Sequence, residues 1–250
     1  MHMSDALVSP PVAGVAGLLS ASLLLIALRK VKKDDHLLPL MGIMGAFTFA
    51  VQMINFTIPG TGSSGHIIGG ILLAALLGPW AGFITLSSVL ILQCFLFADG
   101  GLLALGCNIF NMAACSCLIA YPLAYRPLVA SGRLFLASVT ACVVALMLGA
   151  FAVTLETTAS EVTALPFSRF LLFMLPIHGV IGIGEGVATA AVLSFLLRHR
   201  PELFQPSAPV SGRKVWIGLA VALALAVGGY FWASSLPDGL EWSIEKTIGE

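Results

Sequence analysis

Charged residues are scarce in this 250-residue chain, and neither sign predominates. Lys and Arg together number 12, Asp and Glu together number 12, and the formal net charge at pH 7 is zero. Charged residues make up 10% of the chain, whereas soluble globular domains carry about 25%. The lack of a basic excess argues against nucleic acid as a partner. The composition therefore points away from both a soluble domain and a nucleic-acid-binding protein.

Several chemical signatures are also missing. The five cysteines all fall inside apolar segments, and an odd number in that setting argues against a disulfide framework. A glycine-rich stretch before residue 66 lacks the Lys-Ser/Thr ending of a nucleotide-binding P-loop, and no His-Glu-x-x-His helix of a metal-dependent hydrolase occurs. Neither a catalytic triad nor a paired-carboxylate site is found. We therefore expect no enzyme and no organic cofactor, and any ATPase must be a separate subunit.

Long apolar segments fill most of the chain, whose mean hydropathy is +1.01. A membrane span needs about 20 mostly apolar residues. The segments that meet or approach this length predict eight spans, at 11–29, 37–56, 66–79, 81–98, 102–125, 133–155, 168–197 and 214–234. The third is the shortest. The predicted fold class is an all-α polytopic membrane protein, in which a seven-helix body is followed by one C-terminal transmembrane helix in the lipid bilayer.

The basic residues predict how these spans are oriented, because Lys and Arg concentrate in cytoplasmic connections. With the amino terminus outside, only Arg169 and Lys246 lie on the outer side. The other ten become cytoplasmic: Arg29, Lys30, Lys32, Lys33, Arg126, Arg133, Arg198, Arg200, Arg213 and Lys214. We expect a multi-pass protein of the cell membrane with an extracytoplasmic amino terminus. Residues 201–213, rich in proline and charge, predict a cytoplasmic linker between a domain at 1–200 and a second at 214–250.

A histidine directly after the amino terminus can chelate a metal ion. The terminal amine of Met1, the deprotonated backbone amide of His2 and the imidazole Nδ1 of His2 form two fused chelate rings. These nearly coplanar nitrogen donors suit Ni²⁺ or Cu²⁺, and Co²⁺ is accepted when it is the more available metal. A histidine at position two also occurs by chance, so this feature alone does not establish a site. One equatorial position remains to be filled.

His66 is the candidate for the fourth donor. It ends an outward loop, residues 55–66, in which Gly60, Gly62 and Gly65 relieve steric limits on the backbone. Such a loop folds tightly and can aim its last side chain. An isolated histidine in this place is more often a helix cap or an interfacial residue. The presence of two histidines on the same side of the membrane favours a shared metal site.

Several motifs resemble one family closely. They are MHMSDALVSP at 1–10, GSSGH at 62–66, LGPWAG at 77–82, LFADGG at 96–101, ALGCNIFNM at 104–112 and HGVIGIGEG at 178–186. The chain is thereby identified as similar to the metal-binding membrane component of cobalt and nickel energy-coupling factor (ECF) transporters. The resemblance covers residues 1 to 200. The stretch SSLPDGLEWS at 234–243 is similar to the PDGLE accessory module that accompanies or is fused to such components.

The resemblance implies a function and a set of ligands. It implies that Ni²⁺ or Co²⁺ is the transported substrate, captured from outside by Met1, His2 and His66. It also implies two kinds of partner, a transmembrane scaffold subunit and ATP-binding cassette ATPase subunits. In the family the PDGLE module assists metal loading or transport, and by orientation residues 237–241 should lie outside, near the metal loop. The sequence does not distinguish nickel from cobalt.

Two alternatives remain open. One is a similar helical frame that binds an organic solute such as a vitamin, which predicts an aromatic-lined pocket under the outer loops. The other is a second metal site formed by His178, Glu185 and Asp99, although helical rise separates the first two by about two turns. Asn108 and Asn111 share a helix face. They either pack helices together or hold the metal loop.

Overall fold

Helices form nearly all of the regular structure. The computed structural model describes residues 1–31, 37–201 and 212–249. Its helices are α1 (Pro10–Lys30), α2 (Leu37–Gln52), α3 (Gly70–Leu77), α4 (Pro79–Phe97), α5 (Leu105–Asn108), the π-helical η2 (Ile109–Tyr125), α6 (Arg126–Ala130), α7 (Leu134–Ser160), α8 (Phe167–His199), α9 (Gly212–Trp232) and α10 (Gly239–Ile248). A 3-10 turn, η1 (Asp5–Leu7), precedes them, and two short strands, β1 (Phe56–Ile58) and β2 (Ser63–Gly65), form a hairpin. The predicted helical fold class is confirmed.

Five helical segments of the described residues are long and apolar enough to cross a membrane. They are α1, α4, the continuous segment Leu105–Ala130, α7 and α8. Two shorter apolar helices occupy the predicted second and eighth spans, namely α2 with 16 residues and the stretch Trp216–Gly229 of α9. Except for the third, the predicted spans therefore coincide with helices. Such a set of apolar helices is that of a multi-pass membrane protein.

The predicted third span, 66–79, is wrong as a single membrane-crossing helix. α3 has eight residues, which rise about 12 Å against a hydrocarbon thickness of about 30 Å. Residues 66–69 before it are not helical, and such backbone is tolerated at depth only where protein surrounds it. Lys30, in the last turn of α1, lies 4.3 Å from the ring centroid of Trp80 at the start of α4. The third segment therefore consists of a non-helical stretch, residues 66–69, followed by the short helix α3, and it ends beside the basic end of α1.

Glycines bring α8 against α7. A Cβ atom at Gly182 would lie 2.8 Å from the Cα atom of Val143, and one at Gly186 would also meet the α7 backbone. Only glycine permits so close an approach of two backbones. Glu185 lies between these two glycines and is itself buried. The close packing of α7 and α8 therefore fixes a carboxylate inside the bundle.

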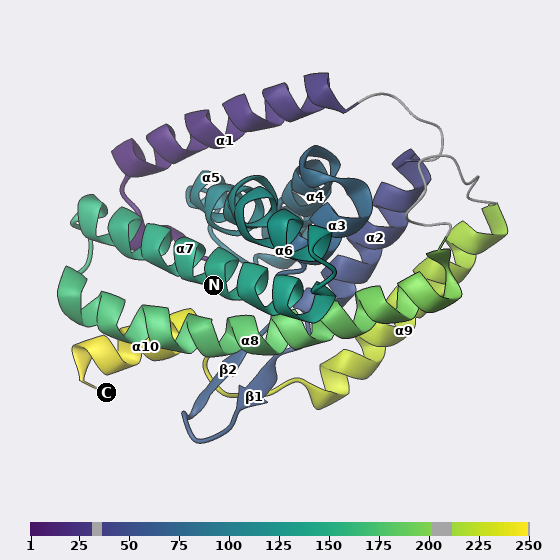
Figure 1. Ribbon diagram of the computed structural model, residues 1–250. Coiled ribbons are helices and arrows are strands. Elements are labelled where there is room, and N and C mark those ends of the chain that lie inside the picture. The colour runs from purple at the N-terminus through teal and green to yellow at the C-terminus, as the bar shows by residue number, and fades with distance from the viewer. Residues whose placement is uncertain (32–36, 202–211, 250) are drawn as a thin grey trace.

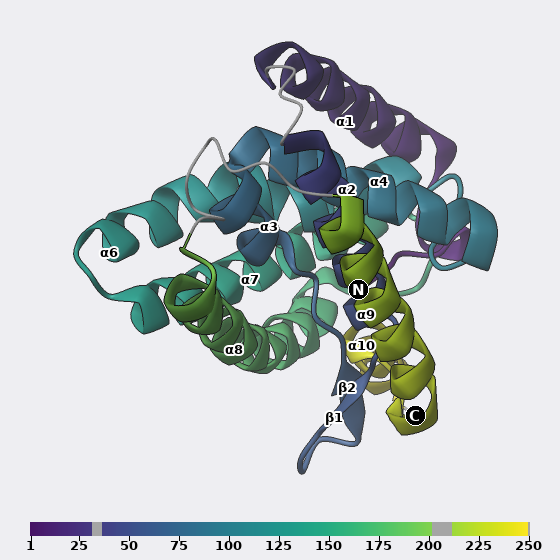
Figure 2. The ribbon, with the colours of Figure 1, turned by 90° about the vertical axis from the view of Figure 1, so that its right-hand side faces the viewer.

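The amino terminus, the hairpin and the C-terminal helix meet in one region. Figures 1 and 2 show α10 beside β2 and α8, with the amino terminus close to them. In the hairpin, Phe56 pairs with Gly65 and Ile58 with Ser63. The turn between the strands contains Gly60 and Gly62 at positive φ, +78° and +76°, which is the conformational freedom expected of this loop. The loop before α3 thus has a defined shape.

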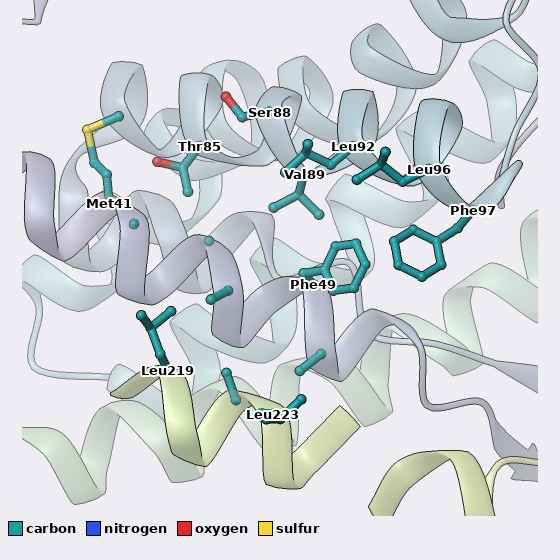
Figure 3. A pocket seen from close by; sticks show the side chains of 15 residues that line it. Met41, Phe49, Thr85, Ser88, Val89, Leu92, Leu96, Phe97, Leu219 and Leu223 are labelled. Atoms are coloured by element: carbon teal, nitrogen blue, oxygen red, sulfur yellow. The ribbon is translucent and has the colours of Figure 1, made fainter. Parts of the chain in front are cut away.

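An apolar groove is lined by α2, α4 and α9, and α2 packs against the other two. Its volume is about 590 Å³ and its lining includes Phe49, Phe97 and Leu223 (Figure 3). The hydroxyls of Thr85 and Ser88, which also line it, donate to backbone carbonyls of their own helix.

Residues 202–211, which include most of the predicted linker, lie outside the described residues.

Candidate metal centre

The first residues of the chain are folded into the protein. Met3 is fully buried, and its backbone N–H donates to Asn108 Oδ1 at 2.8 Å. Its carbonyl accepts from Asn108 Nδ2 at 3.1 Å and from the backbone N–H of Gly101 at 2.8 Å. Asp5 Oδ1 accepts from the N–H of Ala104 at 3.0 Å. The amino terminus is therefore held in place by α5 and by the segment that joins α4 to α5.

This anchoring brings His2 against His66. Their rings stack with centroids 5.2 Å apart and an interplanar angle of 21°. The Nε2 atoms of both are buried and have no hydrogen-bond partner among the described residues. Nδ1 of His2 lies 3.4 Å from Asp99 Oδ1, which is longer than an ordinary N–H···O hydrogen bond. Within the described part of the chain, no group accepts a hydrogen bond from the backbone N–H of His2.

The terminal amine of Met1 completes this set of nitrogens. It donates to Asp238 Oδ2 at 2.8 Å, and this ion pair is mostly buried. A cavity of about 10 Å³ adjoins it, lined by Met1, Gly65, His66, Ile68, Leu146, His178, Ile181 and Gly239. That volume is close to the minimum that holds one water molecule. The predicted ligands Met1, His2 and His66 thus converge although 65 positions separate the first from the last.

Burial sets the protonation of this cluster. It lowers the pKa of the His2 imidazole, against the raising effect of Asp99. It lowers the pKa of His66 further, helped by the charge of the terminal ammonium. Burial opposes ionisation of Asp238, but the Met1 ammonium, through its charge and its hydrogen bond, and the backbone N–H of Glu241 outweigh it, so the pKa of this carboxyl lies below its ordinary value. At neutral pH both imidazoles are uncharged and can offer a lone pair, as metal coordination requires.

Glu185 anchors the backbone that directly follows His66. The two carboxylate oxygens accept from the backbone N–H groups of Ile68 at 2.8 Å and Gly69 at 3.0 Å. Gln52 Nε2 donates to the carbonyl of Ile68 at 2.7 Å. Glu185 therefore acts on the site through the backbone that follows His66.

Replacing Glu185 by Gln is expected to weaken metal binding without removing a ligand. The substitution keeps the side-chain volume but turns one acceptor into an NH₂ donor that faces a backbone N–H. A buried donor left without an acceptor costs about 1–3 kcal/mol, which loosens the loop. Isothermal titration with Ni²⁺ checks this. We expect the affinity for Ni²⁺ to fall about tenfold, which is the lower end of the range for residues that contact a metal ligand without binding the metal. Unchanged affinity would show that the loop does not depend on this carboxylate.

The alternative second site is not assembled. Nδ1 of His178 donates to the carbonyl of Met174 at 2.8 Å, Glu185 binds the loop amides, and Asp99 faces His2. No group of three or more His, Cys, Asp and Glu side chains suited to a metal ion occurs within residues 1–31, 37–201 and 212–249.

Some residues of the site are not foreseen from the sequence. Asp238, whose carboxylate binds the Met1 amine, comes from the far end of the chain, and the sequence suggests Asp99 only as a ligand of the alternative second site. A local signal for Asp238 exists, since Asp followed three residues later by Glu is a capping-box pattern. This pattern predicts that a helix starts at Asp238, but it does not predict that Asp238 binds the Met1 amine. The expected position of residues 237–241 beside the loop that carries His66 is confirmed by the backbone bridge between Ser64 and Asp238. Their extracytoplasmic location stays a prediction.

Comparisons with known proteins agree with this architecture. Residues 2–203 match the CbiM family, described as the cobalt uptake substrate-specific transmembrane region, and residues 212–250 match the PDGLE domain. A putative metal transport protein of Haloquadratum walsbyi is 37% identical over 207 residues, which cover 81% of this chain and 93% of that protein. The fused nickel transport protein NikMN of Rhodobacter capsulatus is 30% identical over 273 residues, covering 100% of this chain and 78% of that one.

A solved structure has the same fold. The crystal structure of a truncated transition metal transporter is similar with a TM-score of 0.69 and 31% identity, and the match covers 80% of this chain and 99% of that chain. A second crystal structure of a transition metal transporter has a TM-score of 0.70, with 79% of this chain covered. The chain belongs to the CbiM family of transmembrane components of metal transporters, and a PDGLE domain follows its family region.

Proposed function

We propose that this chain captures Ni²⁺ or Co²⁺ from the extracytoplasmic side, as the substrate-binding subunit of an ATP-driven uptake transporter of the ECF type. The convergence of the Met1 amine with two stacked, uncharged imidazoles carries the proposal. Together with the His2 amide these groups are four nitrogen donors, and such a set favours nickel, copper or cobalt over magnesium and calcium. When the ion binds, Nδ1 of His2 gives up its contact with Asp99 and coordinates the ion instead.

The charge distribution supports capture from outside. α1 and α8 both end at the right-hand side of Figure 1, and each has basic residues in its last turn. α10 lies at the left-hand side. Since basic residues concentrate in cytoplasmic connections, the metal centre faces the outer side. We assign ATP hydrolysis to separate ATPase subunits coupled through a membrane scaffold, because this chain carries no nucleotide-binding motif.

An organic solute is the weaker candidate. Sites for such molecules combine an apolar lining with a few polar groups that fix the orientation of the ligand. The groove between α2, α4 and α9 has aromatic rings, but both of its hydroxyls are already bonded to helix carbonyls. The cavity beside His66 is about 10 Å³. This volume suits an ion and not a vitamin.

Metal binding is expected to weaken as the pH falls. The amine and the His2 amide must lose protons to coordinate, so protons compete with the ion. Burial lowers the pKa of His2 and His66, so these rings add little competition until the pH is below their ordinary value of about 6.5. Affinity for Ni²⁺, measured on protein with a free Met1, should fall about tenfold per pH unit for each proton released. Affinity that does not change with pH would contradict the nitrogen chelate.

A further inference from the structure

The PDGLE segment reaches the metal centre through a single carboxylate. Asp238 caps α10, with Oδ1 accepting from the backbone N–H groups of Leu240 at 2.8 Å and Glu241 at 2.9 Å. Glu241 returns a bond by accepting from the Asp238 N–H at 3.1 Å. The cap occupies one oxygen only. The other, Oδ2, accepts from the Met1 amine at 2.8 Å.

The same segment also binds the loop that carries His66. The backbone N–H of Ser64 donates to the carbonyl of Pro237 at 2.8 Å, and its hydroxyl donates to the carbonyl of Leu236 at 2.8 Å. Nε1 of Trp242 donates to the carbonyl of Thr61 at 3.0 Å. Residues 236–242 therefore contact both halves of the donor set, which are the amino terminus and the hairpin.

Coordination chemistry allows Asp238 to keep its contact while the ion is bound. A coordinated amine uses its lone pair for the metal and retains two N–H bonds. One of these can continue to donate to Oδ2, which directs the lone pair away from the carboxylate. Groups that hold a metal ligand in this way orient it and raise its basicity. The α10 cap fixes the position of Asp238, so the amine is held against a rigid support.

We propose that Asp238 is a positioning residue for the Met1 amine, so that the PDGLE segment completes the metal site of the family region. The inference rests on the proposed function, since it assumes that the amine is a ligand. The C-terminal segment then contributes directly to the affinity of the protein for the metal ion. The accessory domain is then part of the binding site itself.

Asp238→Asn tests this with little effect on the helix. Asn is preferred at helix starts as strongly as Asp, so its oxygen keeps the α10 cap. Its NH₂ group then faces the amine, where a donor meets a donor and no hydrogen bond can form. Affinity for Cu²⁺, which binds nitrogen sites more tightly than nickel, should fall by about 10- to 100-fold. Glu241→Gln is the matched control, because it also removes one charge from the segment but does not touch Met1.

A double-mutant cycle separates positioning from general support of the fold. Its second change adds two residues, Gly-Gly, before Met1, which removes the primary amine from that position. If Asp238 acts through the amine, Asp238→Asn has no further effect on the residual Cu²⁺ affinity of the extended protein. Equal losses in the extended and unextended proteins would overturn the proposal, as would an Asp238→Asn protein that binds as tightly as the parent. If the parent protein itself binds no metal, the proposed function fails instead.

Discussion

Two residues added before Met1 are expected to abolish high-affinity binding of Ni²⁺ and Co²⁺. The extension converts the primary amine into a peptide nitrogen and destroys both fused chelate rings, so that only the imidazoles of His2 and His66 remain. Changes outside the ligand shell already cost about 10- to 100-fold in affinity, so the loss of two ligands should exceed about 100-fold. Isothermal titration on purified protein measures it.

The length of the extension matters for this experiment. A single added residue would place histidine third in the chain, where the terminal amine, two amides and the ring form a new four-nitrogen chelate. Two added residues avoid that site. His2→Ala with an unextended Met1 is the companion variant, and it should lose affinity to a similar extent. Tight binding by either protein would show that the amino terminus is not the chelating group.

Removal of His66 is expected to have the second large effect. His66→Ala leaves the three nitrogens of Met1 and His2 in place but opens the fourth position to water, whose oxygen is a weaker donor for these metals. The stacking of the two rings at 5.2 Å is lost as well. We expect affinity to fall more than about 100-fold, since a direct ligand contributes more than an outer-shell group, and uptake by the assembled transporter to cease.

His178→Ala is the control for His66→Ala. His178 lines the same small cavity and is also buried, but its Nδ1 is bonded to a carbonyl of its own helix. We assign it no metal-ligating role, so its removal should change affinity only a few-fold. If His178→Ala abolished binding while His66→Ala did not, the fourth ligand would have to be reassigned.

The helices of this protein could be predicted from the sequence because their signal is local. A run of apolar residues of sufficient length predicts a span wherever it occurs, and this held for α1, α4, α7 and α8. The segment 66–79 failed because hydropathy reports the composition of a segment and not its backbone. Residues 66–69 are apolar enough to be counted, but the amides of Ile68 and Gly69 bond to Glu185 instead of forming a helix.

The candidate site was predictable only in part, for a related reason. A histidine at position two has a chemical meaning that requires no fold, and His66 follows a glycine pattern with a known effect on the backbone. The partners of these residues come from distant parts of the chain. Asp238 lies 237 positions from Met1, and Asn108 lies 105 positions from Met3. Such pairings depend on how helices pack, which single-sequence patterns do not specify.

X-ray absorption spectroscopy of the Ni²⁺-loaded protein, with Met1 as its unblocked first residue, tests the central claim most directly. We predict one ion per chain, held by four nitrogen donors in a square-planar arrangement, two of which give the multiple-scattering pattern of imidazole. A first shell of six oxygen and nitrogen donors, or the same spectrum after two residues are added before Met1, would contradict the amino-terminal chelate.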